Sequence, residues 1–177
     1  MASRITQAYT TVGTYGVGNI NSFKIRTVPN GAIVSTADIH NFTIGELGFN
    51  ANGERTVVQL SAKANRGVLV ASPERRFAEG EVLADFYNAV GEPARAIILD
   101  LGVRFETSSF SKNTGVTTLS NGMVAHFDVT TKKFIISASG SPHTDYAGSA
   151  NQFVVVATDT DLTAIDGQAV VRLEVTK

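Results

Sequence analysis

The sequence contains no cysteine and no tryptophan among its 177 residues. Without cysteine, a disulfide framework, a thiolate zinc site and a cysteine nucleophile are all excluded, and the absence is typical of a chain that folds in a reducing cytoplasm. Long apolar runs are also missing, since no window reaches the roughly 20 apolar residues of a membrane helix. The first residues hold no apolar run long enough for a signal peptide, so we expect a soluble protein made in a cytoplasm.

Acidic residues are absent from the N-terminal part of the chain. Residues 1–37 contain Arg4, Lys24 and Arg26 and no aspartate or glutamate, although the whole chain has a net charge of −1. So balanced a total argues against a general nucleic-acid binder. Three scattered cations are too few for a strong phosphate-binding track. The basic stretch could instead lie along an acidic protein surface, or it could be a solvated arm.

Residues 1–22 are predicted to form an extended arm, and residues 23–177 a single β domain. In the arm, tyrosine and valine are spread among glycines and small polar residues, a pattern that packs poorly on itself and is ordered by a neighbour. Extended arms attach by adding main-chain hydrogen bonds to an exposed sheet edge. The residues that we expect at this protein interface are Arg4, Ile5, Tyr9, Val12 and Tyr15.

The stretch Leu83–Thr107 is predicted to be the centre of the β domain. Leu83–Tyr87 favours a short strand, and Asn88–Pro93 has the Asn, Gly and Pro residues of a turn. Ala94–Leu101 is apolar almost without a break, which is typical of a strand buried on both faces. Gly102 then predicts a bend, and the residues after it alternate between apolar and charged, as in a half-buried strand.

Short strands with turns between them predict an all-β fold, either a compact β-barrel or a β-sandwich of short antiparallel strands. Thr36–Asn52 has little periodicity and is predicted to be a long loop, and Ser72–Glu74 has the residues of a helix start. The predicted core residues are Val57, Leu60, Val68, Val70, Leu83, Phe86, Ile97, Leu99, Phe105, Val124, Phe127, Ile135, Val154, Val156, Val171 and Leu173.

Candidate catalytic and metal-binding residues are few. His40, His126 and His143 do not lie at metal-ligand spacing in the sequence, so we expect structural roles for all three. Acids in the central stretch could form a pair for glycoside hydrolysis, but Glu92 lies in a predicted turn and Asp100 beside a predicted bend, where such residues are common. These acids are Asp85, Glu92, Asp100 and Glu106.

A second acidic group, Asp159–Asp161 followed by Asp166–Gly167, does not have the spacing of an EF-hand calcium loop. We interpret its members as solvated loop acids. We therefore predict a protein that is not an enzyme, with no catalytic residue, no cofactor and no bound metal.

Several segments of the central stretch resemble an arrangement in small head-associated proteins of tailed bacteriophages. The segments are Asp85–Asn88, Gly91–Glu92, Ala94–Ala96 and Leu101–Phe105, and Gly53–Val57 and Val171–Val175 fit the same pattern. The resemblance implies a non-enzymatic virion protein that decorates or cements the capsid exterior. Its implied partners are the major capsid protein and further copies of itself, with no nucleic acid, membrane or small-molecule substrate.

Other interpretations remain open. The chain could be a head-fibre base or a tail structural component, or it could be a carbohydrate- or receptor-binding β module. An aromatic platform on a concave face would favour the binding module. A flat apolar surface together with an ordered arm would favour capsid decoration.

Overall fold

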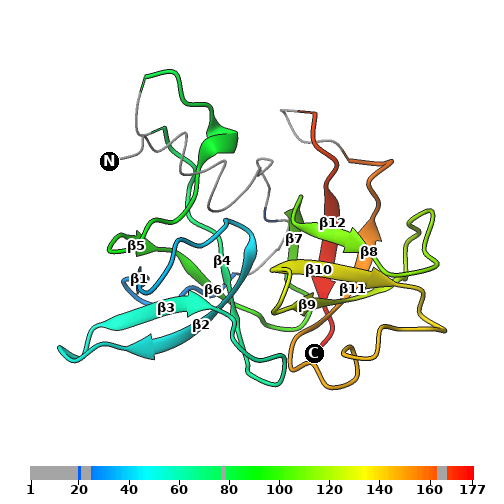
Figure 1. Cartoon of the computed structure of the whole chain (residues 1–177), viewed down its shortest axis with the longest axis horizontal. Helices are drawn as coiled ribbons and strands as arrows, with labels where there is room; N and C mark the ends of the chain where they lie inside the picture. The colour runs from blue at the N-terminus through cyan, green and yellow to red at the C-terminus, as the bar shows by residue number, and fades with distance from the viewer. Residues whose placement is uncertain (1–19, 21–24, 77–78, 163–166) are drawn as a thin grey trace.

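The computed structural model describes residue 20 and residues 25–76, 79–162 and 167–177. This part of the chain consists of strands, turns and one short 3-10 helix, η2 (Leu83–Asp85) (Figure 1). The predicted all-β class is therefore confirmed. In the described ranges, no helix is long and apolar enough to cross a membrane.

The strands form two six-stranded sheets, which Figure 1 shows side by side. From edge to edge, the first sheet consists of β5 (Pro93–Ala94), β1 (Ala32–Val34), β3 (Arg55–Gln59), β2 (Thr43–Phe49), β4 (Val68–Val70) and β6 (Ala96–Ile98). The second consists of β7 (Arg104–Thr107), β12 (Val171–Val175), β11 (Gln152–Ala157), β9 (Val124–Asp128), β10 (Lys133–Ser137) and β8 (Phe110–Lys112). Neighbours are antiparallel, as predicted, except for the parallel pairs β1–β3 and β8–β10.

The main hydrophobic core draws side chains from both sheets. Phe134 lies among three other aromatic rings of the second sheet, with centroid distances of 5.5 Å to Phe105, 5.2 Å to Phe127 and 5.2 Å to Phe153. Leu69 and Ile97 of the first sheet belong to the same buried cluster. The stretch predicted to be the centre of the β domain thus contributes to the core. It does so through β6 in the first sheet and β7 in the second.

The first sheet buries its second face as well. Val68 and Val70 of β4 and Ala96 of β6 belong to a smaller buried cluster, whereas the residues between them, Leu69 and Ile97, belong to the main core. Since successive strand residues point to opposite faces, each of these strands is covered on both sides. The prediction that the apolar run before Gly102 is buried on both faces is confirmed for β6.

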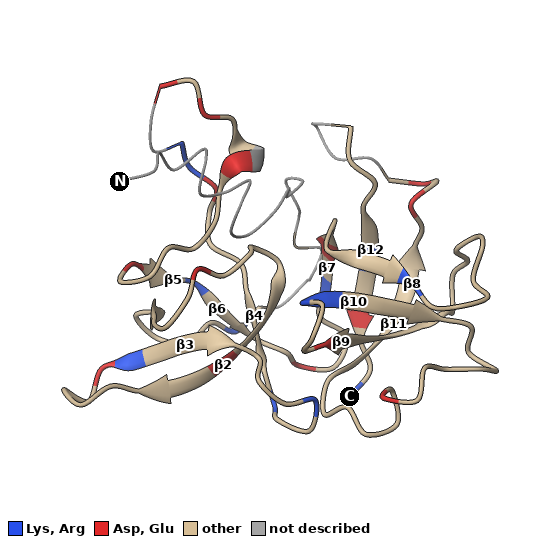
Figure 2. Cartoon of the chain, in the orientation of Figure 1, with Lys and Arg blue, Asp and Glu red and all other residues tan. Residues whose placement is uncertain are grey.

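Figure 2 marks where charged residues lie along the strands, and those of β7 and β12 pair across the two strands. Arg104 lies opposite Glu174 in the β7–β12 ladder, with Nε and Oε2 2.5 Å apart. Arg172 lies opposite Glu106, with Nη2 and Oε1 2.7 Å apart. The predicted alternation of these strands is confirmed, because directly opposed unlike charges occupy the face away from the core.

Most of the predicted core residues are buried, but four on the second sheet, Val124, Ile135, Val154 and Val156, are only half-buried. The prediction assigned β11 to the wrong face. Its core residues are Phe153 and Val155, the neighbours of those predicted. A run such as QFVVVA is apolar at almost every position, so it contains no alternation from which the buried face could be read.

Three local predictions are wrong. The predicted strand at Leu83–Tyr87 is instead the helix η2, and Leu83 is 40% exposed. The predicted loop Thr36–Asn52 contains β2, the longest strand of the first sheet. The helix predicted to begin at Ser72 is not formed in the described residues 72–76.

Gly45 interrupts the alternation of side chains by which β2 could have been predicted from the sequence. A Cβ atom on Gly45 would lie 2.6 Å from Val57 Cγ2 and 2.8 Å from Val70 Cγ2. The neighbouring strands β3 and β4 therefore approach so closely that no side chain fits between their valines. The residue that permits this packing is also a poor strand former, which is why the sequence pattern indicated a loop.

Candidate functional site

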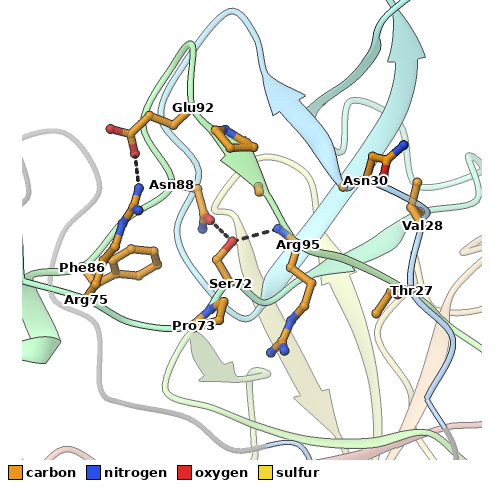
Figure 3. Close-up of a pocket in the computed structure, with 13 residues that line it drawn as sticks. Thr27, Val28, Asn30, Ser72, Pro73, Arg75, Phe86, Asn88, Glu92 and Arg95 are labelled. Carbon is orange, nitrogen blue, oxygen red and sulfur yellow. Dashed lines mark hydrogen bonds and ion pairs between the residues drawn. The ribbon is translucent and has the colours of Figure 1, made fainter.

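A pocket of about 450 Å³ opens beside β5, between the segment that precedes β1 and the connection from β4 to β5 (Figure 3). Its lining includes Ser72, Arg75, Phe86, Asn88, Glu92 and Arg95. Phe86 is only 5% exposed. The pocket therefore offers no open ring face of the kind that would form an aromatic platform for a sugar.

The polar groups at the base of this pocket belong to a buried hydrogen-bond network. Ser72 Oγ donates to Asn88 Oδ1 at 2.5 Å and accepts from the backbone amide of Arg95 at 2.9 Å (Figure 3). Asn41, which is fully buried, accepts at Oδ1 from Ser72 N at 2.9 Å and from Asn88 Nδ2 at 3.2 Å. These side chains join the β1–β2 and β4–β5 connections of the first sheet, so their hydrogen-bonding capacity serves the fold.

The charged groups at the rim of the pocket also have partners. Arg75 Nη2 lies 3.4 Å from Glu92 Oε2. Arg95 Nε donates to the carbonyl of Ala71 at 2.6 Å. The pocket can thus present a paired acid and base to a polar surface.

The four acids of the central stretch each have a different partner. Asp85 Oδ2 accepts from the backbone amide of Val82 at 2.8 Å. Asp100 forms an ion pair with Arg26 at 2.5 Å, and Glu92 and Glu106 pair with the arginines described above. Their contacts explain them as turn and strand residues, and the structure does not bring them into a shared site.

The acids near residue 160 hold a turn. Asp161 Oδ2 accepts from Thr158 at both its backbone amide (2.9 Å) and its hydroxyl (2.7 Å). These hydrogen bonds hold the pKa of Asp161 below its usual range. Asp159 pairs with Lys112 at 3.1 Å, so the interpretation of both residues as solvated loop acids was incomplete. Asp166 lies outside the described residues.

Two histidines that are distant in the sequence meet in the second sheet. The rings of His126 and His143 stack with centroids 5.0 Å apart and planes inclined by 23°. His126 lies between Ala125 and Phe127, both of which face the main core, so its own ring points to the opposite face of β9. It is nevertheless only 1% exposed, because His143 and the β10–β11 loop (residues 138–151) cover that face.

Asp145 completes the cluster. One ligand atom from each of His126, His143 and Asp145 lies within 4.8 Å of the others. Asp145 Oδ2 is 3.8 Å from His143 Nδ1, and its Oδ1 accepts a hydrogen bond from Lys63 Nζ. That bond lowers the pKa of Asp145, and burial lowers the pKa of His126.

The sequence analysis did not identify this cluster, and its expectation of structural roles for His126 and His143 stays a prediction. The two histidines come from β9 and from the loop after β10, so their spacing in the sequence matches no metal-binding motif. The pair His143 and Asp145, two residues apart, was the only local signal. His40 has a separate environment, with Nδ1 3.1 Å from the carbonyl of Asn41.

The predicted interface residues Arg4, Ile5, Tyr9, Val12 and Tyr15 lie outside the described residues, and they stay a prediction. Of the predicted arm, only Ile20 is described. It forms an isolated antiparallel bridge with Phe105 and packs against the main core. The C-terminal end of the predicted arm is therefore attached to the β domain.

Comparisons with known proteins place the chain among prophage proteins. The model of the family described as "YonC prophage protein" matches residues 11–176. The SPbeta prophage-derived uncharacterized protein YonC of Bacillus subtilis (strain 168) is 52% identical over 176 residues, which cover 99% of this chain and 98% of that protein. No solved structure matches the chain.

Proposed function

Because the chain belongs to the YonC prophage protein family, we propose that it is a structural protein of the virion that decorates or cements the exterior of a phage capsid. The phage origin that the sequence resemblance implied is confirmed by the family. The proposal adds a location on the particle and a partner, the major capsid protein. It also includes self-association and a non-enzymatic role.

The observation that carries this proposal is a group of exposed apolar side chains on one connection. Six large hydrophobic side chains are exposed in the part of the chain that the structure describes. Three of them, Val82 (56% exposed), Leu83 (40%) and Val90 (50%), lie on the β4–β5 connection. Exposed apolar side chains are typical of interaction surfaces, so we take this connection as the candidate surface.

Hydrogen bonds hold residues 82–90 of this connection in place. The backbone amide of Val82 donates to Asp85, and that of Val90 donates to Asp38 Oδ1 at 2.9 Å. The buried Asn88 lies between these two points and exchanges backbone hydrogen bonds with Ile39. A segment that is already ordered loses little conformational entropy on binding. The free energy gained by burying its apolar side chains is therefore reduced only slightly by the cost of ordering.

We expect the double substitution V82D and V90D to lower the occupancy of the protein on purified phage particles by about tenfold or more. Full burial of one such side chain is worth roughly 1.5–3 kcal/mol, and about 1.4 kcal/mol corresponds to a tenfold change in binding. Occupancy is measured by quantitative mass spectrometry of particles of the encoding phage, complemented with each variant. The melting temperature of each purified variant reports whether it is folded.

Leu101→Asp provides the matched control, because Leu101 is 75% exposed in the turn between β6 and β7, away from the β4–β5 connection. Its occupancy should stay near that of the unsubstituted protein. Absence of the unsubstituted protein from purified particles would overturn the virion role. If the protein is present, electron microscopy of labelled particles distinguishes a position on the head from one on a fibre or the tail.

The predicted arm allows a second test. We expect deletion of residues 1–18 to leave a folded domain with nearly the same melting temperature while particle occupancy falls sharply. The deletion stops before Ile20 because that residue packs against the main core. Failure of the truncated chain to fold would show that these residues form part of the domain, and unchanged occupancy would show that they do not attach it to the particle.

A further inference from the structure

The His126 side chain has an unsatisfied polar atom in the interior. Its Nε2 is buried and has no hydrogen-bond partner among the described residues. A buried polar atom without a partner costs roughly 1–3 kcal/mol, so each such atom in a native fold calls for an explanation. The neighbours His143 and Asp145 supply one, because both contribute metal-ligating atoms to the same place.

We propose that His126, His143 and Asp145 form a zinc site that fastens the β10–β11 loop to the second sheet. Two imidazole nitrogens and one carboxylate oxygen are a common ligand set for this ion, with a water molecule in the fourth position. The site is separate from the β4–β5 connection, and it does not depend on the proposed role in the virion. It departs from the sequence-based prediction that the protein binds no metal.

Zinc binding requires a small movement of His143. Tetrahedral coordination with bonds near 2.0–2.1 Å brings ligand atoms to about 3.4 Å from one another, compared with up to 4.8 Å here. A nitrogen lone pair also lies in the plane of its ring, so two nearly parallel stacked rings cannot both aim at one ion. His126 is held within β9, whereas His143 lies on the loop with its side chain 33% exposed, so His143 is the ring that turns.

The surrounding loop is already organised for such a site. The backbone amide of His143 donates to Ser137 Oγ at 3.1 Å. The hydrogen bond from the backbone amide of Asp145 to His143 Nδ1, at 3.2 Å, is lost when the ring turns. Ser149 Oγ donates to the carbonyl of Asp145 at 2.9 Å. Because the bonds to Ser137 and from Ser149 hold the backbone of two ligands beside the third, the loop needs little further ordering when the ion binds.

The two oxygens of Asp145 face different neighbours. Its Oδ2 lies 3.8 Å from His143 Nδ1, and its Oδ1 accepts from Lys63 Nζ. Lys63 is at the same time a competitor, because its ammonium group occupies one oxygen of Asp145.

The test is calorimetric titration of the full chain with zinc chloride after removal of metals with a chelator. We expect one zinc ion per chain. The substitution H143A should weaken binding by more than about 100-fold, since loss of even an outer-shell partner costs 10–100-fold. His143 is partly exposed, so this variant should fold, which its melting temperature without zinc checks. Magnesium should not compete, because it prefers oxygen ligands.

Two further variants separate a metal site from a purely structural histidine pair. K63M removes the competing ammonium group and should strengthen zinc binding about two- to fivefold, the range expected for an exposed ion pair. H40A alters a histidine outside the cluster and should leave zinc affinity unchanged. Absence of zinc binding, or equal affinities for H40A and H143A, would overturn the proposal and assign His126 Nε2 to a buried water molecule. Unchanged affinity in K63M would remove Asp145 from the ligand set.

Discussion

Replacement of Phe134 by alanine is expected to lower the free energy of unfolding by about 3–5 kcal/mol. Phe134 is fully buried in β10 and contacts three other aromatic rings, at centroid distances between 5.2 and 5.5 Å. Its loss would leave a cavity walled by rings from β7, β9 and β11, which cannot close without moving three strands. Urea denaturation followed by circular dichroism measures the change.

Phe49→Ala is the matched control, because it makes the same chemical change at the end of β2, where the ring is 65% exposed. The guanidinium group of Arg55 lies over the ring of Phe49, with Cζ 4.5 Å from the ring centroid. Such an exposed contact is worth about 0.5–1 kcal/mol. Equal losses of stability in the two variants would mean that Phe134 does not occupy the centre of the core.

Replacement of Asn41 by alanine should cost about 2–5 kcal/mol. Its side chain accepts from the backbone amide of Ser72 and donates to the carbonyl of the same residue, both at 2.9 Å, and it also accepts from Asn88. Alanine would remove the partners of two buried backbone groups, each of which costs roughly 1–3 kcal/mol when unsatisfied. Thermal and urea unfolding would both report the loss.

Asn52→Ala is the comparison for this prediction, since Asn52 is exposed in the β2–β3 turn. We expect it to change stability by no more than about 0.5 kcal/mol, as surface substitutions usually do. A similar result for both asparagines would show that the network beneath the pocket does not stabilise the first sheet. If Asn41→Ala is destabilising as expected, the network is the element that ties the β4–β5 connection, with its exposed valines, to the sheet.

The candidate sites were the part least accessible from sequence. The network of Asn41, Ser72 and Asn88 joins two connections, and none of these residues has a local pattern that marks it as buried. The cluster of His126, His143 and Asp145 exists because the β10–β11 loop folds back over β9. Side chains from separate segments meet only after the order of the strands and the path of the loops are set.

The sequence by itself determined the all-β class and the turns. It also determined the buried faces of β7 and β12, because their charged and apolar residues alternate and so mark the two sides locally. Only the tertiary structure decided the buried face of β11, whose residues are nearly all apolar, and the presence of β2, whose Gly45 accommodates valines of two neighbouring strands. The physical reason is the distance along the sequence over which each feature is set. Side-chain alternation is a property of adjacent residues. Packing between distant segments decides which face of a uniformly apolar strand is buried, where strands approach closely at a glycine, and that His126 meets His143.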